Sequence, residues 1–235
     1  MTQRSVGSAH LRSRLRGYVP WVLASAGATV AAAALQSRGT TDFERFMGPL
    51  PPALTVATAG VVGAGALWLL EGRGFWRATS RSRMARGLAI ASVATLPFAA
   101  VAIGVDALVG FPRDTNLAWP GAWLFYPTIA LVAETAFRLL PLAGLVWMTR
   151  TRFVGRALDG RTWALVLATA TVEPAAQLAL GSALPAFVVP HVYVFGVIQL
   201  LLFRRYGYLP MLWFRVCYYL IWHVLWGGAR LELLF

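Results

Sequence analysis

The sequence contains no lysine, and its 21 basic residues are all arginine. Acidic residues are scarce as well, with 9 in the chain, and charged residues make up only 13% of the total. Soluble domains usually carry about a quarter charged residues, so this composition excludes an ordinary soluble domain. A single cysteine, Cys217, excludes a framework of disulfides within the chain.

Apolar residues take the place of the missing charges, since 58% of the 235 residues are hydrophobic and the mean hydropathy is +0.64. Most of the apolar segments reach the roughly 20 residues that a helix needs to cross a bilayer core. Strands are not expected, because an open strand leaves backbone groups unpaired in lipid. We therefore predict an all-α polytopic membrane bundle of about seven transmembrane helices, at residues 19–36, 53–70, 87–110, 121–148, 162–182, 184–203 and 209–230.

The formal net charge is +12, and a positive charge of this size often indicates a nucleic-acid partner. Here, however, the arginines flank apolar segments instead of forming one polar face, so we expect the lipid bilayer as a partner and no nucleic acid. Their alternation between loops is what the positive-inside rule predicts for seven spans with a cytoplasmic N-terminus. Residues 4–16, 73–86, 150–161 and 204–205 are rich in arginine, whereas the opposite loops hold only Arg38, Arg45, Arg113 and Arg230.

Three regions follow from this pattern. We expect a basic cytoplasmic N-terminus at residues 1–18, three transmembrane helices within 19–120, and a core of four transmembrane helices within 121–235. The first apolar run follows basic residues, as in a signal peptide, but it is longer than a usual signal core, so we expect a retained span. The arginine bias suits a GC-rich bacterial genome, so we expect a multi-pass protein of the bacterial inner or plasma membrane.

Polar side chains inside the apolar segments are the candidate functional residues. An ionisable group at the centre of a span costs about 2.5–3.5 kcal/mol on insertion scales, and its default interpretation is functional. Arg215 is expected either to snorkel toward the interface or to meet a carboxylate. The polar residues within the spans are Glu134, Arg138, Glu173, Gln177, His191, Gln199, Arg215 and His223.

Three of these side chains are predicted to lie at one depth in the outer half of the membrane. Glu134 lies 8 to 11 residues past Trp123 and Tyr126, or roughly 12–16 Å at 1.5 Å per residue. His191 and His223 each lie roughly 10 Å from the outer end of their segments. Equal depth does not show that the side chains face each other, which depends on the fold.

The two glutamates have different local settings. Arg138 lies one helical turn after Glu134, so it can neutralise or orient that carboxylate, or form an ion pair that only fixes helix packing. Pro141 removes a helix hydrogen bond, so a kink is expected close to this pair. Glu173 precedes Pro174, and it is expected to be either a second site residue or a cap for a neighbouring arginine or hydroxyl.

The order of these residues resembles the CPBP family of intramembrane proteases, named for members that process CAAX proteins and bacteriocins. Its pattern is EExxxR on one helix, FxxxH on a later helix, and HxxxN or HxxxD on the last core helix. The resemblance covers roughly residues 121–227 and implies a membrane-embedded metalloendopeptidase that cleaves a membrane-associated or hydrophobic peptide. The matching residues are Glu134 and Arg138 in "AETAFR", Phe187 and His191 in "FVVPH", and His223 in "HVLWG".

The resemblance also implies roles for these residues. Glu134, His191 and His223 would be catalytic, with Arg138, Phe187 and Glu173 in supporting positions. The family's first glutamate, which activates water, is Ala133 here, and its final Asn or Asp is Gly227. The hypothesis is therefore that Glu134 or Glu173 takes over the role of the base.

The chemistry of the set is consistent with peptide hydrolysis. A carboxylate in a low-dielectric site gains basicity, and a neutral imidazole can bind a metal or donate to an oxyanion. Two histidines and one carboxylate match a catalytic zinc site with one open position, so the pattern predicts Zn²⁺ bound by Glu134, His191 and His223.

Other functions remain open at this point. A non-catalytic relative that binds a membrane partner is favoured by Ala133 and Gly227. His191 and His223 on adjacent helices would also suit the two axial ligands of a b-type haem. A transporter is the weakest of the alternatives, because the sequence lacks paired broken helices in two halves.

Overall fold

The computed structural model describes residues 3–38, 43, 48–77, 80–181 and 184–233, and within these residues it contains helices and no strands. The predicted all-α class is therefore confirmed. The long helices are α1 (Gln3–Ser37), α3 (Pro52–Gly72), α4 (Arg81–Val109) and α9 (Pro185–Tyr206). The shorter helices are α5 (Ala122–Glu134), α6 (Leu140–Met148), α7 (Gly160–Ala170), α8 (Val172–Ala179), α10 (Tyr208–Tyr219) and α11 (Gly227–Leu233).

Five stretches of the described chain are long and apolar enough to cross a membrane. They match five of the seven predicted segments, and are Gly17–Ser37, Pro52–Gly72, Arg81–Val109, Ala122–Met148 and Ala186–Tyr206. The other two segments are helical but interrupted, by Thr171 between α7 and α8, and by a π-helical stretch, Leu220–Trp226, between α10 and α11. Membrane association through apolar helices is thus supported, while the count of seven spans stays a prediction.

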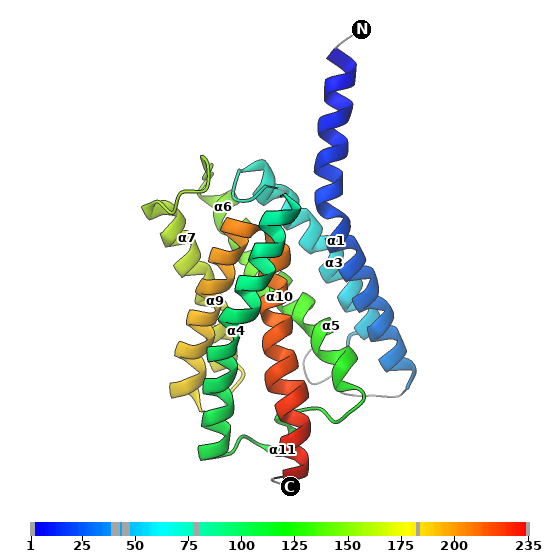
Figure 1. The fold of residues 1–235 in the computed structure, drawn as a ribbon, viewed down its shortest axis with the longest axis vertical. Coiled ribbons are helices and arrows are strands. Elements are labelled where there is room, and N and C mark those ends of the chain that lie inside the picture. Colours follow the sequence, from blue (N-terminus) through cyan, green and yellow to red (C-terminus); the bar gives the residue numbers. More distant parts are fainter. Residues whose placement is uncertain (1–2, 39–42, 44–47, 78–79, 182–183, 234–235) are drawn as a thin grey trace.

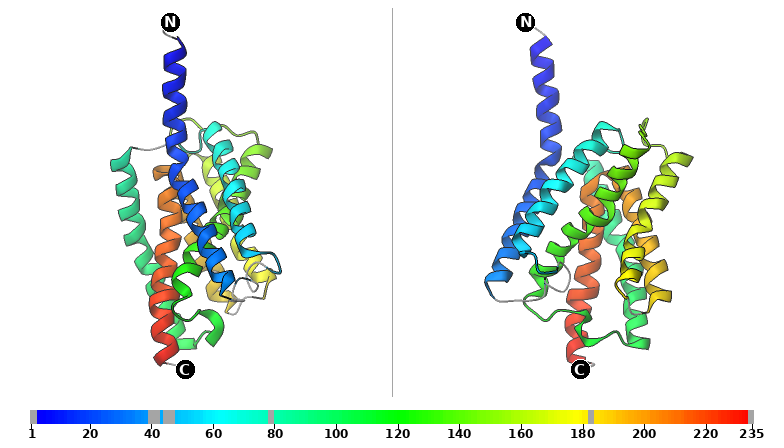
Figure 2. Two further views of the ribbon diagram at one scale, coloured as in Figure 1. Left: turned by 90° about the vertical axis from the view of Figure 1, so that its right-hand side faces the viewer. Right: turned by 180° about the vertical axis from the view of Figure 1, so that it is seen from behind.

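Helix α10 lies at the centre of the bundle and packs against α4, α5 and α9 (Figure 1). Helix α1 packs against α3 and α5 on one side, while α7 and α9 lie together on the other side (Figure 2). The N-terminal part of α1 projects beyond the bundle, and both figures show the helix changing direction where it reaches the other helices.

This change of direction has an identifiable cause in α1. Pro20 has no N–H to donate, and the hydroxyl of Tyr208 enters the backbone ladder beside it. Tyr208 accepts from the N–H of Trp21 at 2.9 Å and donates to the carbonyl of Gly17 at 3.0 Å. A side chain inserted in the ladder bends a helix, so this one hydroxyl both bends α1 and fastens it to α10.

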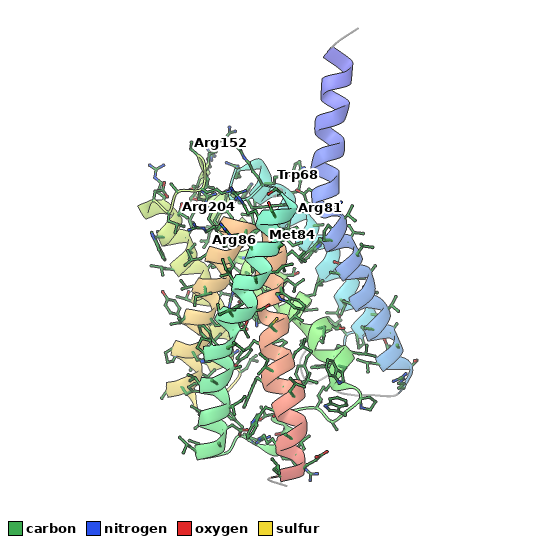
Figure 3. The ribbon with its side chains drawn as sticks, in the orientation of Figure 1. Trp68, Arg81, Met84, Arg86, Arg152 and Arg204 are labelled. Carbon is green, nitrogen blue, oxygen red and sulfur yellow. The ribbon has the colours of Figure 1, made fainter. Side chains whose placement is uncertain are left out.

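Arginines gather at one end of the bundle. Figure 3 shows Arg81, Arg86, Arg152 and Arg204 near the end from which the N-terminal part of α1 projects. These four residues belong to the arginine-rich stretches that the positive-inside rule assigns to one side of the membrane. Their position agrees with the predicted alternation, and the orientation relative to the cytoplasm stays a prediction.

Candidate functional site: a buried ionic network and a histidine cluster

Five polar side chains from four of the predicted segments meet in the interior of the bundle. Each has at most 4% of its surface exposed, in a region where the neighbouring residues are apolar. Charges in such a region require partners, because an unpaired buried charge is costly. The members of this buried network are Glu134, Arg138, Glu173, Gln199 and Arg215.

Arg215 on α10 joins the two carboxylates. Its Nη1 and Nη2 atoms lie 2.8 Å from the two oxygens of Glu173, which is a bidentate pair, and its Nε donates to Oε1 of Glu134. Bidentate geometry is the strong form of an arginine–carboxylate contact. Of the two outcomes predicted for Arg215, the structure shows the meeting with a carboxylate.

Arg138 has a different partner from the one its spacing predicts. Its Nη2 lies 2.5 Å from Oε2 of Glu173, and its Nε donates to Oε1 of Gln199 at 3.1 Å. Gln199 in turn donates through Nε2 to Oε1 of Glu134. Arg138 is thus linked to Glu134 through Gln199, while its ion pair is with Glu173, 35 residues along the chain.

The backbone around Arg138 explains its position. Pro141 cannot donate to the carbonyl of Phe137, and Nη1 of Arg138 donates to that carbonyl at 3.0 Å. A π-helical turn, Thr135–Leu139, ends two residues before the proline, where the sequence predicted a kink. On the facing helix, a Cβ atom at Gly196 would lie 2.7 Å from Nη2 of Arg138, so the guanidinium fits only because that residue is glycine.

One atom of the network stands apart. Oε2 of Glu134 is buried and has no hydrogen-bond partner among the described residues, although Oε1 of the same carboxylate accepts from Arg215 and Gln199. Buried polar atoms are nearly always paired with protein or water. Among the carboxylate oxygens of the network, Oε2 of Glu134 is thus the one without a partner among the described residues.

The second cluster surrounds His223 on the π-helical stretch. The imidazole stacks on Tyr126, with ring centroids 4.5 Å apart and an interplanar angle of 12°. Its Nδ1 lies 3.3 Å from Nδ2 of Asn116, a buried residue in the connection between α4 and α5. Asn116 is held by Arg230, whose Nη1 donates to Oδ1 at 3.3 Å, and Arg230 pairs with Asp106 at 2.8 Å.

These contacts determine the tautomer of His223. Arg230 only donates, so the atom it contacts is the oxygen of the Asn116 amide, and Nδ2 then donates to the carbonyl of His223 at 3.4 Å. The same NH₂ group donates to Nδ1 of His223, which must therefore lack a proton. In a neutral imidazole the proton is then on Nε2, so this nitrogen is a donor.

His191 lies on α9 and is enclosed by aromatic rings. Its Nε2 is 3.2 Å from the hydroxyl of Tyr218, and its ring lies 4.9 Å from Phe187 and 5.3 Å from Phe98, centroid to centroid. The structure therefore brings the predicted pair Phe187 and His191 into contact. The Tyr218 ring also contacts His223, at a centroid distance of 6.5 Å.

The predicted trio is thus divided between two clusters that are linked by Arg215 and two tyrosines. Arg215 donates to the hydroxyl of Tyr219 at 3.1 Å, and the Tyr219 ring lies 5.1 Å from the ring of His223. Within the described ranges, no group of three or more His, Cys, Asp or Glu side chains lies close enough to hold a metal ion. Zinc binding by Glu134, His191 and His223 stays a prediction that requires these side chains to rearrange.

Asn116 is the functional candidate that the sequence did not reveal. It lies outside the apolar segments, next to other polar residues, where an amide is unremarkable. Its signal was its rarity, because it is the only asparagine in the chain. Asp106 was another such case, since an acid near the end of a segment is ordinarily interfacial, yet here it is 1% exposed and paired with Arg230.

Comparison with models of protein families, with curated proteins and with solved structures found no match for this chain. The resemblance to CPBP proteases therefore depends on the motif residues in the sequence.

Proposed function

We propose that this chain is an intramembrane peptide hydrolase of the CPBP type, with Glu134 as the base. The observation that carries the proposal is Oε2 of Glu134, a buried carboxylate oxygen that accepts no hydrogen bond from the described residues. Arg215 and Gln199 hold Oε1, so the carboxylate has a fixed orientation. The oriented carboxylate takes the role that the family assigns to the glutamate at position 133, which is Ala133 here.

The proposed reaction is a general base hydrolysis. Oε2 of Glu134 takes a proton from water, and the hydroxide attacks the peptide carbonyl carbon. The Nε2–H of His223, a donor in its tautomer, stabilises the resulting oxyanion once the two clusters have been brought together around the substrate. The C–N bond then breaks, and the proton held by Glu134 passes to the leaving amine. No step is assigned to a metal, because these side chains do not fit a metal site in the described arrangement.

The reaction needs an opening motion. Glu134 is 0% exposed, so a peptide reaches it only when helices around the network separate. The substrate class that suits this access is a membrane-associated or hydrophobic peptide, which arrives through the bilayer. Conformational steps of this kind often limit the rate of an enzyme.

A second candidate is a non-catalytic membrane protein that binds a partner. The observation in its favour is charge balance, because the two glutamates of the network face two arginines and each carboxylate has an arginine partner. A balanced buried network can serve to specify helix packing alone. Ala133 and Gly227, in place of the family's acid and amide, favour the same function.

The two candidate functions predict different peptide products in cells that express the protein. New peptide N-termini in the membrane fraction would be compared between wild type, Glu134→Gln and His223→Gln, with Gln177→Ala as a control on α8. Hydrolysis predicts a set of N-termini that both site variants lose and that the control retains. If the three variants and the wild type give the same N-termini, the protein is not a protease.

Two further measurements keep the result interpretable. Equal amounts of folded protein in the membrane, measured by size-exclusion chromatography in detergent, show that a variant has lost activity and not its fold. An absorption spectrum of the purified wild type tests the haem alternative, because a Soret band would replace the protease proposal with a bis-histidine haem protein.

A further inference from the structure

A cavity of about 720 Å³ lies at the arginine-rich end of the bundle, away from both clusters of the candidate site. It is formed by the start of α4, the end of α9 and the connection that precedes α7. Figure 3 shows Arg86 and Arg204, two of its lining residues, at this end of the helices. The lining residues are Ser80, Ser82, Arg83, Arg86, Arg156, Leu158, Leu201, Arg204, Arg205 and Tyr206.

The cavity is strongly positive. Five of its lining residues are arginines, and none of its lining residues is acidic. Burial lowers the pKa of Arg156, and the nearby charges of Arg83 and Arg77 lower it further. Like charges held this close are stabilised by an anion between them.

The cavity has a fixed wall. Arg204 is 3% exposed, and its guanidinium donates to the carbonyls of Gly74, Phe75 and Gly155 at 2.9, 2.6 and 3.0 Å. It therefore holds the connection after α3 and the connection before α7 in place against α9. Arg156 is held in the same way, since its Nη1 donates to the carbonyl of Arg205 at 2.9 Å.

The remaining groups match the parts of a phospholipid. Arg83, Arg86 and Arg205 are exposed, and Ser80 and Ser82 add hydroxyls. Leu158 and Leu201 give the lining an apolar part. Further along α4, Ile90 and Val93 expose 39% and 67% of their surface, so an apolar helix face continues from the cavity toward the membrane interior.

We infer that this cavity binds the phosphate of an anionic phospholipid, with Arg83, Arg86 and Arg156 as its main contacts. Guanidinium groups suit phosphate because they donate in pairs, and basic pockets at the ends of transmembrane helices are suited to anionic headgroups. The position at the end of apolar helices favours a lipid over free phosphate. The inference is independent of the proposed hydrolase activity and of which side of the membrane this end faces.

The test is lipid binding to the purified full-length chain in detergent, measured by native mass spectrometry. The probes are phosphatidylglycerol, phosphatidylcholine and inorganic phosphate. The site variant is Arg83→Gln/Arg156→Gln, and the matched control is Arg150→Gln/Arg152→Gln, which removes the same charge from the same end of the bundle but from residues outside the lining. Removing two contacts should weaken phosphatidylglycerol binding by about tenfold or more.

The expected result is preference for phosphatidylglycerol over phosphatidylcholine, lost in the site variant and retained in the control. Equal loss in both double variants would mean that the net charge of this end, and no built site, attracts the lipid. Equal binding of the two lipids would overturn the inference, and so would inorganic phosphate that displaces phosphatidylglycerol at comparable concentration. Arg86→Gln provides a second variant, and unfolding temperatures show that each variant is folded.

Discussion

The side chain of Asn116 occupies the space that a side chain at Gly227 would need. A Cβ atom built on Gly227 would lie 2.6 Å from Nδ2 of Asn116 and 2.8 Å from its Cγ. In the HxxxN pattern of the family that this chain resembles, an amide follows the histidine by four residues, and that position is Gly227. In the structure the amide beside His223 is that of Asn116, which comes from a different segment. Asn116 can occupy this position because residue 227 has no side chain.

Gly227→Ala should therefore destabilise the protein, although alanine is the better helix former. The added methyl collides with Asn116, and overpacking of this kind costs typically about 1–3 kcal/mol. The measurement is the free energy of unfolding in lipid bicelles. The Cβ atom of Asn116 also lies within 2.9 Å of the new methyl, so only glycine at position 116 removes the collision. The double variant Asn116→Gly/Gly227→Ala should therefore lose less stability than the two single changes together.

Gly144→Ala is the matched control for this prediction. Gly144 also lies in a helix, α6, but a Cβ atom at this position meets no atom within 4 Å. The change should leave stability the same or raise it slightly, through helix propensity. Equal effects at positions 144 and 227 would show that the space above Gly227 is not filled by Asn116.

Asn116→Asp should exchange the tautomer of His223. The asparagine NH₂ donates to Nδ1, which keeps the proton on Nε2, whereas a carboxylate in that place accepts from Nδ1–H and leaves Nε2 free. Nitrogen-15 NMR of histidine-labelled protein distinguishes the two nitrogens, and His223→Gln assigns the signal among the three histidines. Asn116→Ala should give no such exchange, because it supplies no acceptor.

The tautomer exchange also bears on function. With Nε2 free, His223 loses the donor proposed for the oxyanion and becomes a better metal ligand. Hydrolysis by wild type and its loss in the Asp variant would agree with the donor role. If the spectrum of Asn116→Asp shows that the His223 proton is still on Nε2, Asn116 is not the residue that positions His223.

The composition of the buried network could be predicted from the sequence, while its pairing could not. Charges within apolar runs are conspicuous because they are costly, so Glu134, Arg138, Glu173 and Arg215 were all recognised. Their partners depend on how each helix is rotated, which depth estimates do not contain. The π-helical turn at Thr135–Leu139 changes that rotation, and the carboxylate that Arg138 meets is Glu173.

The surroundings of the two histidines could not be predicted from the sequence either. His191 and His223 were expected beside Glu134 on the basis of depth alone. The described contacts instead place them around Tyr218, whose aromatic side chain gave no reason for selection in a chain with 7 tyrosines. The fold class was easier to predict because it depends only on the length of apolar segments and on backbone hydrogen bonding in lipid.

Arg215→Met should be among the most destabilising single changes in the chain. Arg215 contacts both Glu134 and Glu173, and removing one side of a buried ion pair costs about 3–5 kcal/mol. The free energy of unfolding in bicelles measures the loss. Arg205→Met on exposed surface is the control, and should change stability by less than about 0.5 kcal/mol.

A charge-balanced double variant distinguishes the contribution of the Arg215 charge to stability from the contribution of its side-chain packing. Glu134→Gln/Arg215→Met removes one charge of each sign and leaves Glu173 paired with Arg138. This double variant should recover a large part of the stability lost in Arg215→Met, because no carboxylate is then left without a cation. If the double variant is as unstable as the single one, the guanidinium acts by filling space and its charge is unimportant.

The two interrupted segments should both cross the membrane. In a Cys217→Ser background, single cysteines at position 152 before α7 and position 180 after α8 should react on opposite sides of the membrane with a reagent that does not cross the bilayer. Positions 205 and 233, on either side of the segment from α10 to α11, should behave likewise. Arg152, Leu180, Arg205 and Leu233 are all exposed, so their substitution should leave the fold intact.

By the positive-inside rule, the cysteines at the arginine-rich end should be labelled only after the membrane has been permeabilised. Labelling of both members of a pair from one side would reduce the number of spans below seven.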